Sequence, residues 1–237
     1  MPPRRNKMKR AADILRAEFL SGRSAFDWAF LGLGLLVQAA VFAVEPAGWL
    51  SVVSGMAGIV SVILCSQGKI STFLFGFVQI TTYLVLSWQQ RLYGKVAVNA
   101  FYFLSQFYGI WLWARRYAVR QDNCSAELHT RRMGLKAFGL LLLSVAACSA
   151  LTGGMLAAWT DDTQPWLDAF TTVPALTAQV LLVMAYREQW HFWLLVDVLS
   201  AVMWARAGDW CLFAQYVFWC ANCLYGLRRW KEKSREG

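Results

Sequence analysis

Charge is scarce in this sequence of 237 residues: Asp, Glu, Lys and Arg together make up 16% of it, whereas 58% of the residues are apolar and thirteen are tryptophan. A soluble domain of this size needs many more solvated side chains, so the composition indicates a membrane protein. A hydrocarbon core of about 30 Å takes about 20 apolar residues per helical crossing. The crossings therefore leave no room for a soluble catalytic domain.

Patterns typical of enzymes and metal sites are also missing. The sequence has two histidines, no paired catalytic carboxylates, no G-x-S-x-G motif and no P-loop. Five of the six cysteines fall in apolar runs, which argues against a secreted disulfide framework. Cys220 and Cys223 form a single C-x-x-C, whereas structural zinc needs about four ligands. We expect no enzyme activity, no cofactor and no metal, with an intramembrane enzyme or a helical scaffold as rival classes.

Eight charge-poor stretches are present, each about long enough for a helix to cross a bilayer. The first has no clear small-x-small cleavage site, so we interpret it as a retained helix rather than a signal peptide. The sequence thus predicts an all-α polytopic membrane protein with eight transmembrane helices, over residues 28–44, 48–66, 70–88, 96–114, 136–158, 167–186, 190–205 and 210–227.

The basic residues predict the orientation of these helices. With eight crossings both chain ends lie on one side of the lipid bilayer, and twenty of the 23 Lys and Arg residues fall on that side. Only Arg91, Lys95 and Arg206 fall on the other. Because basic loops stay in the cytoplasm, both termini are predicted to be cytoplasmic. The net charge of +9 then reflects topology, and no nucleic-acid partner is expected.

Parts of the sequence recur at a separation of 117 residues. A Y-G-x-x-x-W motif at 108–113 recurs at 225–230, and a Trp-Leu pair at 49–50 recurs at 166–167. These echoes predict two parallel three-helix repeats joined by a linker helix, with an accessory first helix before them. The predicted segments are 1–46 with the accessory helix, the first repeat 47–116, the loop and linker helix 117–160, the second repeat 161–230 and the basic tail 231–237.

Polar and aromatic residues recur at helical spacing in two helices of each repeat. Because an isolated polar group in hydrocarbon is costly, such residues usually face a partner or a cavity. We expect them to face one substrate cavity. The candidate substrate-binding residues are Thr72, Phe75, Gln79, Asn99, Tyr102, Gln106, Gln189, Trp193, Asp197, Gln215, Phe218, Trp219 and Asn222. Tryptophans near span ends are expected to be interfacial anchors: Trp28, Trp49, Trp88, Trp113, Trp166 and Trp230.

These side chains indicate the chemistry of a ligand. Carboxamides offer donors and acceptors that suit amide and hydroxyl groups. Aromatic faces stack on a flat ring and attract a cationic one by about 0.5–2 kcal/mol. The alternative is that Gln and Asn only join helices, which contributes about 0.6 kcal/mol on average. Asp197, the only carboxylate well inside a span, either accepts hydrogen bonds from a ligand or pairs with a neighbouring donor to lock helices together.

The two Y-G-x-x-x-W segments, the Gly-Phe-Val-Gln stretch at 76–79 and the helix at 99–113 resemble the PnuC family of bacterial nicotinamide riboside transporters, over about residues 48–230. The resemblance implies a SWEET-like fold in one chain, a homotrimer with a pathway in each protomer, and a place in the bacterial inner membrane. The accessory first helix is a departure from the seven-helix core of that family.

The same resemblance implies facilitated diffusion of nicotinamide riboside, with trapping by a cytoplasmic riboside kinase. Related branches carry thiamine or riboflavin, which remain alternative substrates. A phosphate would be buried unpaired, because no Lys or Arg lies at mid-span, so we expect the mononucleotide to be rejected.

The predicted topology can be tested by labelling introduced cysteines from outside the cell. A cysteine at Thr163, in the 161–165 loop, should react with a membrane-impermeant thiol reagent, because this loop is predicted to be external. A cysteine at position 126 should be protected until the membrane is permeabilised. Labelling of position 126 in intact cells would contradict the predicted orientation.

Overall fold

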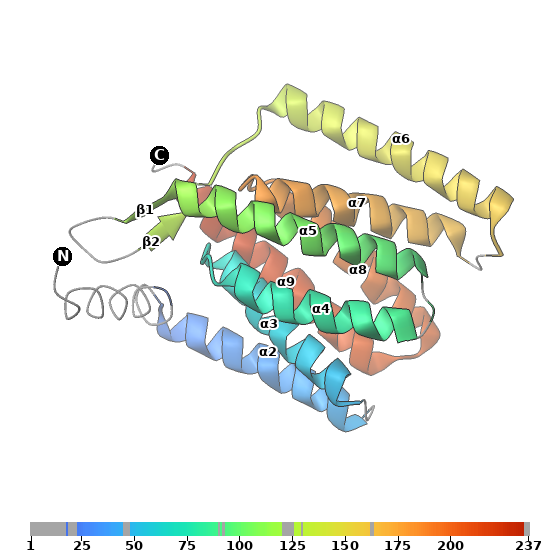
Figure 1. Cartoon of the computed structure of the whole chain (residues 1–237), viewed down its shortest axis with the longest axis horizontal. Helices are drawn as coiled ribbons and strands as arrows, with labels where there is room; N and C mark the ends of the chain where they lie inside the picture. Colours follow the sequence, from blue (N-terminus) through green and yellow to red (C-terminus); the bar gives the residue numbers. More distant parts are fainter. Residues whose placement is uncertain are drawn as a thin grey trace, which may run out of the picture.

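The structure is a computed structural model, and it describes residues 18, 23–44, 48–89, 91, 93–119, 126–128, 130–161 and 164–234. The eight helices expected from the sequence are all present in this part of the chain (Figure 1). Thr163 lies outside the described residues. The helices are α2 (Ala25–Val44), α3 (Trp49–Ser66), α4 (Thr72–Gln89), α5 (Tyr93–Arg116), α6 (Leu135–Trp159), α7 (Pro165–Val183), α8 (Gln189–Ala207) and α9 (Trp210–Lys233).

A short antiparallel ribbon, β1 (Tyr117–Val119) with β2 (Ala126–Leu128), adds to the all-helical expectation. Three-residue strands are too short to give a hydrophobic period in the sequence. The segment is fixed by contacts from elsewhere: Leu128 is buried, and Thr130 Oγ1 donates to the Trp230 carbonyl at 3.0 Å. The Thr130 bond therefore ties the segment that follows β2 to the C-terminal end of α9.

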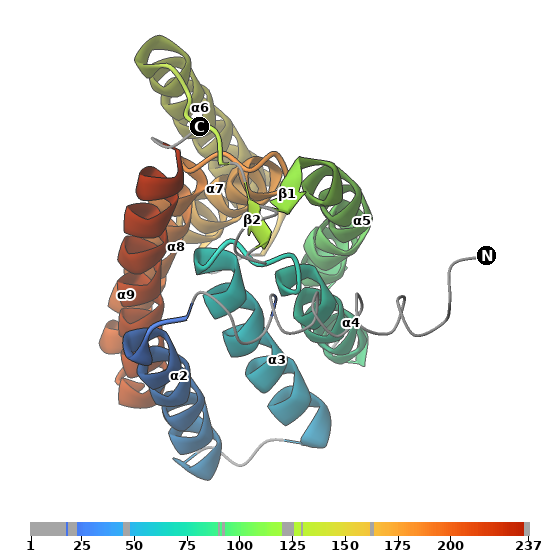
Figure 2. The ribbon, with the colours of Figure 1, turned by 90° about the vertical axis from the view of Figure 1, so that its left-hand side faces the viewer.

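Six helices form a closed ring, which Figure 2 shows nearly end-on. Each packs on the next in the order α3, α4, α5, α7, α8, α9, and α9 packs again on α3. Helix α2 lies outside the ring, against the junction of α3 and α9, and α6 lies outside it against α7. We call the end of the bundle where α2 begins and α9 ends the terminal end, and the other the far end (Figure 1).

The helix boundaries follow from ordinary local chemistry. Pro165 opens α7, where its missing N–H is not needed. Gly208 ends α8 in the left-handed conformation, with φ of 78°. The next residue, Asp209, accepts a hydrogen bond from the Leu212 N–H at 2.8 Å and so caps α9. These signals make the turn between α8 and α9 short.

Backbone geometry repeats at the separation of 117 residues. Gly68 and Ala185 follow α3 and α7, and both have positive φ, 70° and 58°. The N–H of Gly68 donates to the Cys65 carbonyl and that of Ala185 to the Leu182 carbonyl, each at 2.9 Å. A left-handed alanine is disfavoured by about 1–2 kcal/mol, so the surrounding contacts must hold this turn in place.

The tryptophans of the two Y-G-x-x-x-W motifs make matching long-range hydrogen bonds. Trp113 Nε1 donates to the Leu182 carbonyl at 3.1 Å, and Trp230 Nε1 donates to the Cys65 carbonyl at 3.0 Å. Both tryptophans are fully buried, so our expectation that they are interfacial anchors is wrong. A position near a span end does not show whether a tryptophan faces lipid or packs against a neighbouring helix. Trp28, Trp49, Trp88 and Trp166 are exposed, as an anchor would be.

Four buried rings close the terminal end of the ring of helices: Phe73, Trp113, Trp190 and Trp230, here called the aromatic cluster. Phe73 meets Trp113 edge-on with centroids 4.8 Å apart, and Trp190 meets Trp230 edge-on at 5.8 Å. The two pairs meet at Trp113 and Trp230, whose ring centroids are 5.8 Å apart. Edge-to-face packing of this kind adds about 0.5–1.5 kcal/mol per pair beyond burial.

Among the described helices, four combine the length and low polarity of a membrane span, namely α2, α3, α6 and α7. Four such helices are enough for a multi-pass membrane protein. The other four, α4, α5, α8 and α9, are long as well but more polar. They are also the helices on which the sequence places the candidate substrate-binding residues.

The glycine of each Y-G-x-x-x-W motif should be needed for packing. A Cβ at Gly109 would lie 2.3 Å from the Phe73 ring, and one at Gly226 would lie 2.5 Å from the Trp190 indole. Overpacking of this kind typically costs about 1–3 kcal/mol. Gly109→Ala and Gly226→Ala should therefore lower the thermal unfolding midpoint of the purified protein. Gly139→Ala, on α6 with open space around it, is the matched control and should not lower it.

Candidate functional site

A cavity of about 670 Å³ lies within the ring, and residues of all six ring helices and of α2 line it. At the far end its wall includes Ser51, Lys95 and Asp168. Toward the terminal end the wall includes Phe73 and Trp190, two members of the aromatic cluster. Pockets for small molecules typically measure about 300–1,000 Å³. The cavity is therefore large enough for a nucleoside-sized ligand.

The structure brings nine of the thirteen candidate residues together in the cavity wall. They come from α4, α5, α8 and α9, the four more polar helices. The lower hydropathy of these helices thus reflects side chains that face the cavity. The nine residues are Thr72, Gln79, Asn99, Tyr102, Gln106, Trp193, Asp197, Gln215 and Trp219.

The other four candidates lie outside the cavity wall. Phe218 stacks on Phe30 of α2 with ring centroids 4.9 Å apart. Asn222 and Gln189 are fully buried, and their amide atoms have no hydrogen-bond partner among the described residues. Phe75 is partly exposed on α4. The spacing of Phe218 and Asn222 indicates one face of α9, but Phe218 packs against α2 and α3 instead of lining the cavity.

Three cavity glutamines lie against glycines of α3 and α4. A Cβ in place of the glycine would lie 2.9 Å from the glutamine Nε2 in one pair and 3.1 Å in the other two. Since a side chain of alanine size would displace these amides, the glycines set where the amides lie. All six residues line the cavity. The pairs are Gly55 with Gln38, Gly58 with Gln79, and Gly76 with Gln106.

Hydrogen bonds hold some cavity amides in place and leave others with unused capacity. Gln215 Nε2 donates to Gln38 Oε1 at 3.1 Å, and Asn99 Nδ2 donates to the Lys95 carbonyl at 2.7 Å. Gln106 Oε1 is buried and accepts no hydrogen bond from the described residues. A buried acceptor without a donor costs about 1–3 kcal/mol. A ligand that donates to Gln106 would remove that cost.

Asp197 is 3% exposed and forms part of the cavity wall. The Cys223 Sγ donates to its Oδ2 at 3.2 Å. A thiol is a weak donor, and a carboxylate can accept at about four lone-pair sites. The bond to Cys223 therefore leaves most of the accepting capacity of Asp197 for a ligand.

The charged residues of the wall are Lys95, Asp168 and Asp197. Lys95 and Asp168 lie in the first turns of α5 and α7, at the far end, whereas Asp197 lies in the middle of α8. Two carboxylates and one ammonium favour a cation over an anion. No group of three or more potential metal ligands occurs among the described residues.

Sequence reasoning missed the contribution of the first helix. Gln38 and Phe42 of α2 line the cavity, and Gln38 is 3% exposed. The signal was available, because Gln38 is a polar residue inside the most N-terminal apolar stretch. Gln179 of α7 was also missed; its Nε2 donates to Ser105 Oγ at 2.8 Å, and Gln179 lines the cavity.

A ring of membrane helices around a polar, aromatic cavity is the arrangement of a transporter for a small polar solute. A sequence profile of the family described as nicotinamide mononucleotide transporter matches residues 48–232. The chain belongs to this family, and it is a transporter rather than an enzyme.

Relatives of known name support the same class. The nicotinamide riboside transporter PnuC of Neisseria mucosa is 30% identical, with 91% of this chain and 84% of the relative covered. PnuC of Haemophilus influenzae is 29% identical, with 91% and 94% covered. A crystal structure of the vitamin B3 transporter PnuC superposes with a TM-score of 0.79 at 28% identity, covering 94% of this chain and 97% of that one.

The glycine and glutamine pairs give a test of the cavity. Gly58→Ala and Gly76→Ala should displace the amides of Gln79 and Gln106 without unfolding the helices, because a side-chain tip can move. Loss of one buried hydrogen bond costs about 1–3 kcal/mol, so the Kd for nicotinamide riboside, used as the probe, should rise about tenfold. Isothermal titration of the purified protein measures this.

The control for this experiment is Gly154→Ala on α6, which has open space around it and does not line the cavity. It should leave the Kd unchanged. Unchanged affinity in both cavity variants would mean that Gln79 and Gln106 do not contact the ligand.

Proposed function

We propose that this protein carries nicotinamide riboside across the bacterial inner membrane. The observation that carries the proposal is the cavity, in which carboxamides and Asp197 lie beside tryptophan and tyrosine rings. Relatives named for this substrate cover most of the chain, which supports the same assignment. A second vitamin such as thiamine or riboflavin is the alternative that an experiment should include.

The groups of the riboside match the wall of the cavity. Its ribose hydroxyls can donate to Asp197 and to Gln106 Oε1, and can accept from Gln79. Its pyridinium ring is flat and cationic, and suits Trp193 and Trp219. The excess of carboxylates over lysine in the wall also favours a positively charged ligand. Each part of the ligand thus has a partner of the complementary type.

The riboside is favoured over the mononucleotide, although the family description mentions the latter. Lys95 is the one basic residue in the cavity wall as far as the described residues go, and it lies in the first turn of α5 at the far end. A phosphate deeper in the cavity would meet Asp197 and no cation. Burial of an unpaired charge is costly, so the mononucleotide should be rejected.

All eight helices cross the bilayer in this proposal, with residues 47–116 and 161–230 as two parallel three-helix repeats. The positive φ of Gly68 and Ala185 and the matching bonds of Trp113 and Trp230 support a repeat of 117 residues. Residues 117–160 hold the loop and linker helix, and residues 1–46 and 231–237 flank the repeats. The polar side chains of α4, α5, α8 and α9 are compatible with crossing because many face the cavity.

The terminal end is cytoplasmic in this proposal, because most of the basic residues lie there. The cavity then reaches the external side at Lys95 and Asp168, and the aromatic cluster separates it from the cytoplasm. Release requires these rings to part. Asp197 has no second acid or histidine beside it in the cavity wall as described, so we propose facilitated diffusion rather than proton coupling.

Two partners complete the proposal. A cytoplasmic riboside kinase would trap the product, since the phosphorylated form would not re-enter a cavity that is poor in basic residues. A homotrimer, with a separate pathway in each protomer, follows from the resemblance to the PnuC family.

Flux through proteoliposomes tests the function. Labelled nicotinamide riboside should equilibrate across vesicles that contain the protein, and the mononucleotide should not. Ionophores that dissipate proton and sodium gradients should leave the exchange unchanged, because the proposed mechanism couples to neither ion.

The controls are protein-free vesicles and parallel assays with thiamine and riboflavin. Faster flux of either vitamin would assign the protein to another substrate. Exchange that stops when the gradients are removed would contradict facilitated diffusion.

A further inference from the structure

Helix α2 lies outside the segment 48–232 that matches the family profile, yet it reaches the cavity. Its residue Gln38 is 3% exposed and forms part of the wall. The ring of helices closes without α2, since α3 and α9 pack on each other directly. The polar residue Gln38 therefore reaches the cavity from a helix that is not part of the ring.

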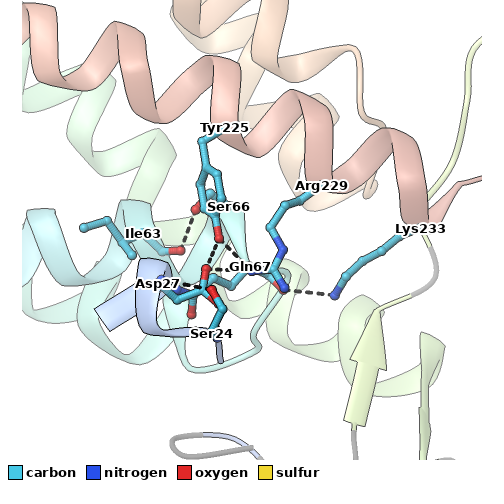
Figure 3. A network of polar contacts seen from close by, with 8 residues as sticks. All are labelled: Ser24, Asp27, Ile63, Ser66, Gln67, Tyr225, Arg229 and Lys233. Atoms are coloured by element: carbon cyan, nitrogen blue, oxygen red, sulfur yellow. Dashed lines mark hydrogen bonds and ion pairs between the residues drawn. The ribbon is translucent and has the colours of Figure 1, made fainter. Parts of the chain in front are cut away.

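Contacts with α9 fix the position of α2 along its length. At the terminal end, Arg229 Nη1 donates to Asp27 Oδ1 at 2.7 Å, and the Tyr225 hydroxyl donates to the same carboxylate oxygen (Figure 3). Asp27 is 2% exposed, so this charge is held by its partners. Two turns further along α2, a Cβ at Gly34 would lie 2.8 Å from the Phe218 ring, so the glycine allows close contact.

The last of these contacts is the amide pair in the cavity. Gln215 Nε2 donates to Gln38 Oε1 at 3.1 Å. Gly55 leaves room for the Gln38 amide, since a Cβ there would lie 2.9 Å from Gln38 Nε2. An amide carries two N–H donors and an acceptor oxygen. The bond between the two glutamines uses the oxygen of Gln38 and a donor of Gln215, which leaves a donor group on Gln38 and an acceptor oxygen on Gln215.

We infer that Gln38 is a substrate-binding residue, and that the Gln38–Gln215 pair recognises the carboxamide of the ligand. This inference rests on the proposed function. A carboxamide carries an acceptor oxygen and an NH₂ donor, so it can accept from Gln38 Nε2 and donate to Gln215 Oε1 at once. Asp27, Tyr225 and Arg229 position the helix that carries Gln38.

A ligand-truncation cycle separates this role from simple joining of helices. The variant is Gln38→Met, which keeps the volume of the side chain and removes its hydrogen bonds. The two probes are nicotinamide riboside and the pyridinium riboside that lacks the carboxamide. The Kd for nicotinamide riboside should rise about tenfold in the variant, as expected for one lost buried hydrogen bond. The Kd for the truncated riboside should change less than about twofold, because it has no carboxamide to lose.

Val41→Ala is the matched control, since Val41 is a buried residue of the same helix that does not line the cavity. It should leave the preference for the carboxamide unchanged. Gly55→Ala is a second route to the same effect: the new methyl group would meet Gln38 Nε2 at 2.9 Å and Phe42 Cζ at 2.8 Å, so it would displace the Gln38 amide together with the Phe42 ring. It should reduce the preference for nicotinamide riboside as Gln38→Met does.

The outcomes are distinct. An equal loss of affinity for both probes in Gln38→Met would show that Gln38 only places helices, and would overturn the inference. Unchanged affinity for nicotinamide riboside would also overturn it, and the proposed function would stand. If wild-type protein binds neither riboside, the proposed function itself is wrong. If Gln38→Met does not fold, Gly55→Ala tests the inference instead. A reduced preference for nicotinamide riboside would support it, and an unchanged preference would overturn it.

Discussion

Polar side chains in a bilayer must find partners within the protein, because hydrocarbon offers none. This constraint shapes the whole fold. Helices α2, α3, α6 and α7 are apolar enough to face lipid, and the more polar helices α4, α5, α8 and α9 turn their amides and hydroxyls toward a shared interior. The cavity is therefore where many polar residues of these helices can be satisfied, by one another and by a ligand.

Close packing at glycines gives that interior its shape. Gly109 and Gly226 admit the rings that close one end, and Gly58 and Gly76 admit the amides that line the middle. In both places a missing side chain on one helix determines where a functional side chain on the next helix lies. The aromatic cluster and the binding groups of the cavity thus both depend on close helix packing at glycines.

Much of this could be predicted from the sequence. Apolar length predicts the helices, and helical spacing predicts nine residues of the cavity wall out of thirteen candidates. Periodicity defines a helix face but not the neighbour it meets, so the spacing predicts that Phe218 lies in the cavity although it packs against α2 and α3. It also could not tell that Trp113 and Trp230 are buried, since their partners are carbonyls of distant residues. Gln38 is a polar residue inside an apolar stretch and so predictable, but the position of its helix outside the repeat gives no sign that it reaches the cavity.

The long-range bonds of α9 have a consequence for biogenesis. Trp230 bonds to a residue 165 positions earlier, and Arg229 pairs with one 202 positions earlier. Until the ribosome has delivered the last helix, Asp27 and the Cys65 carbonyl lack these partners within the membrane. At about 5–20 residues per second, the nascent chain holds an open ring for about 10–40 s. Through that interval Asp27 lacks Tyr225 and Arg229, and the arrival of the last helix both pairs this carboxylate and closes the ring.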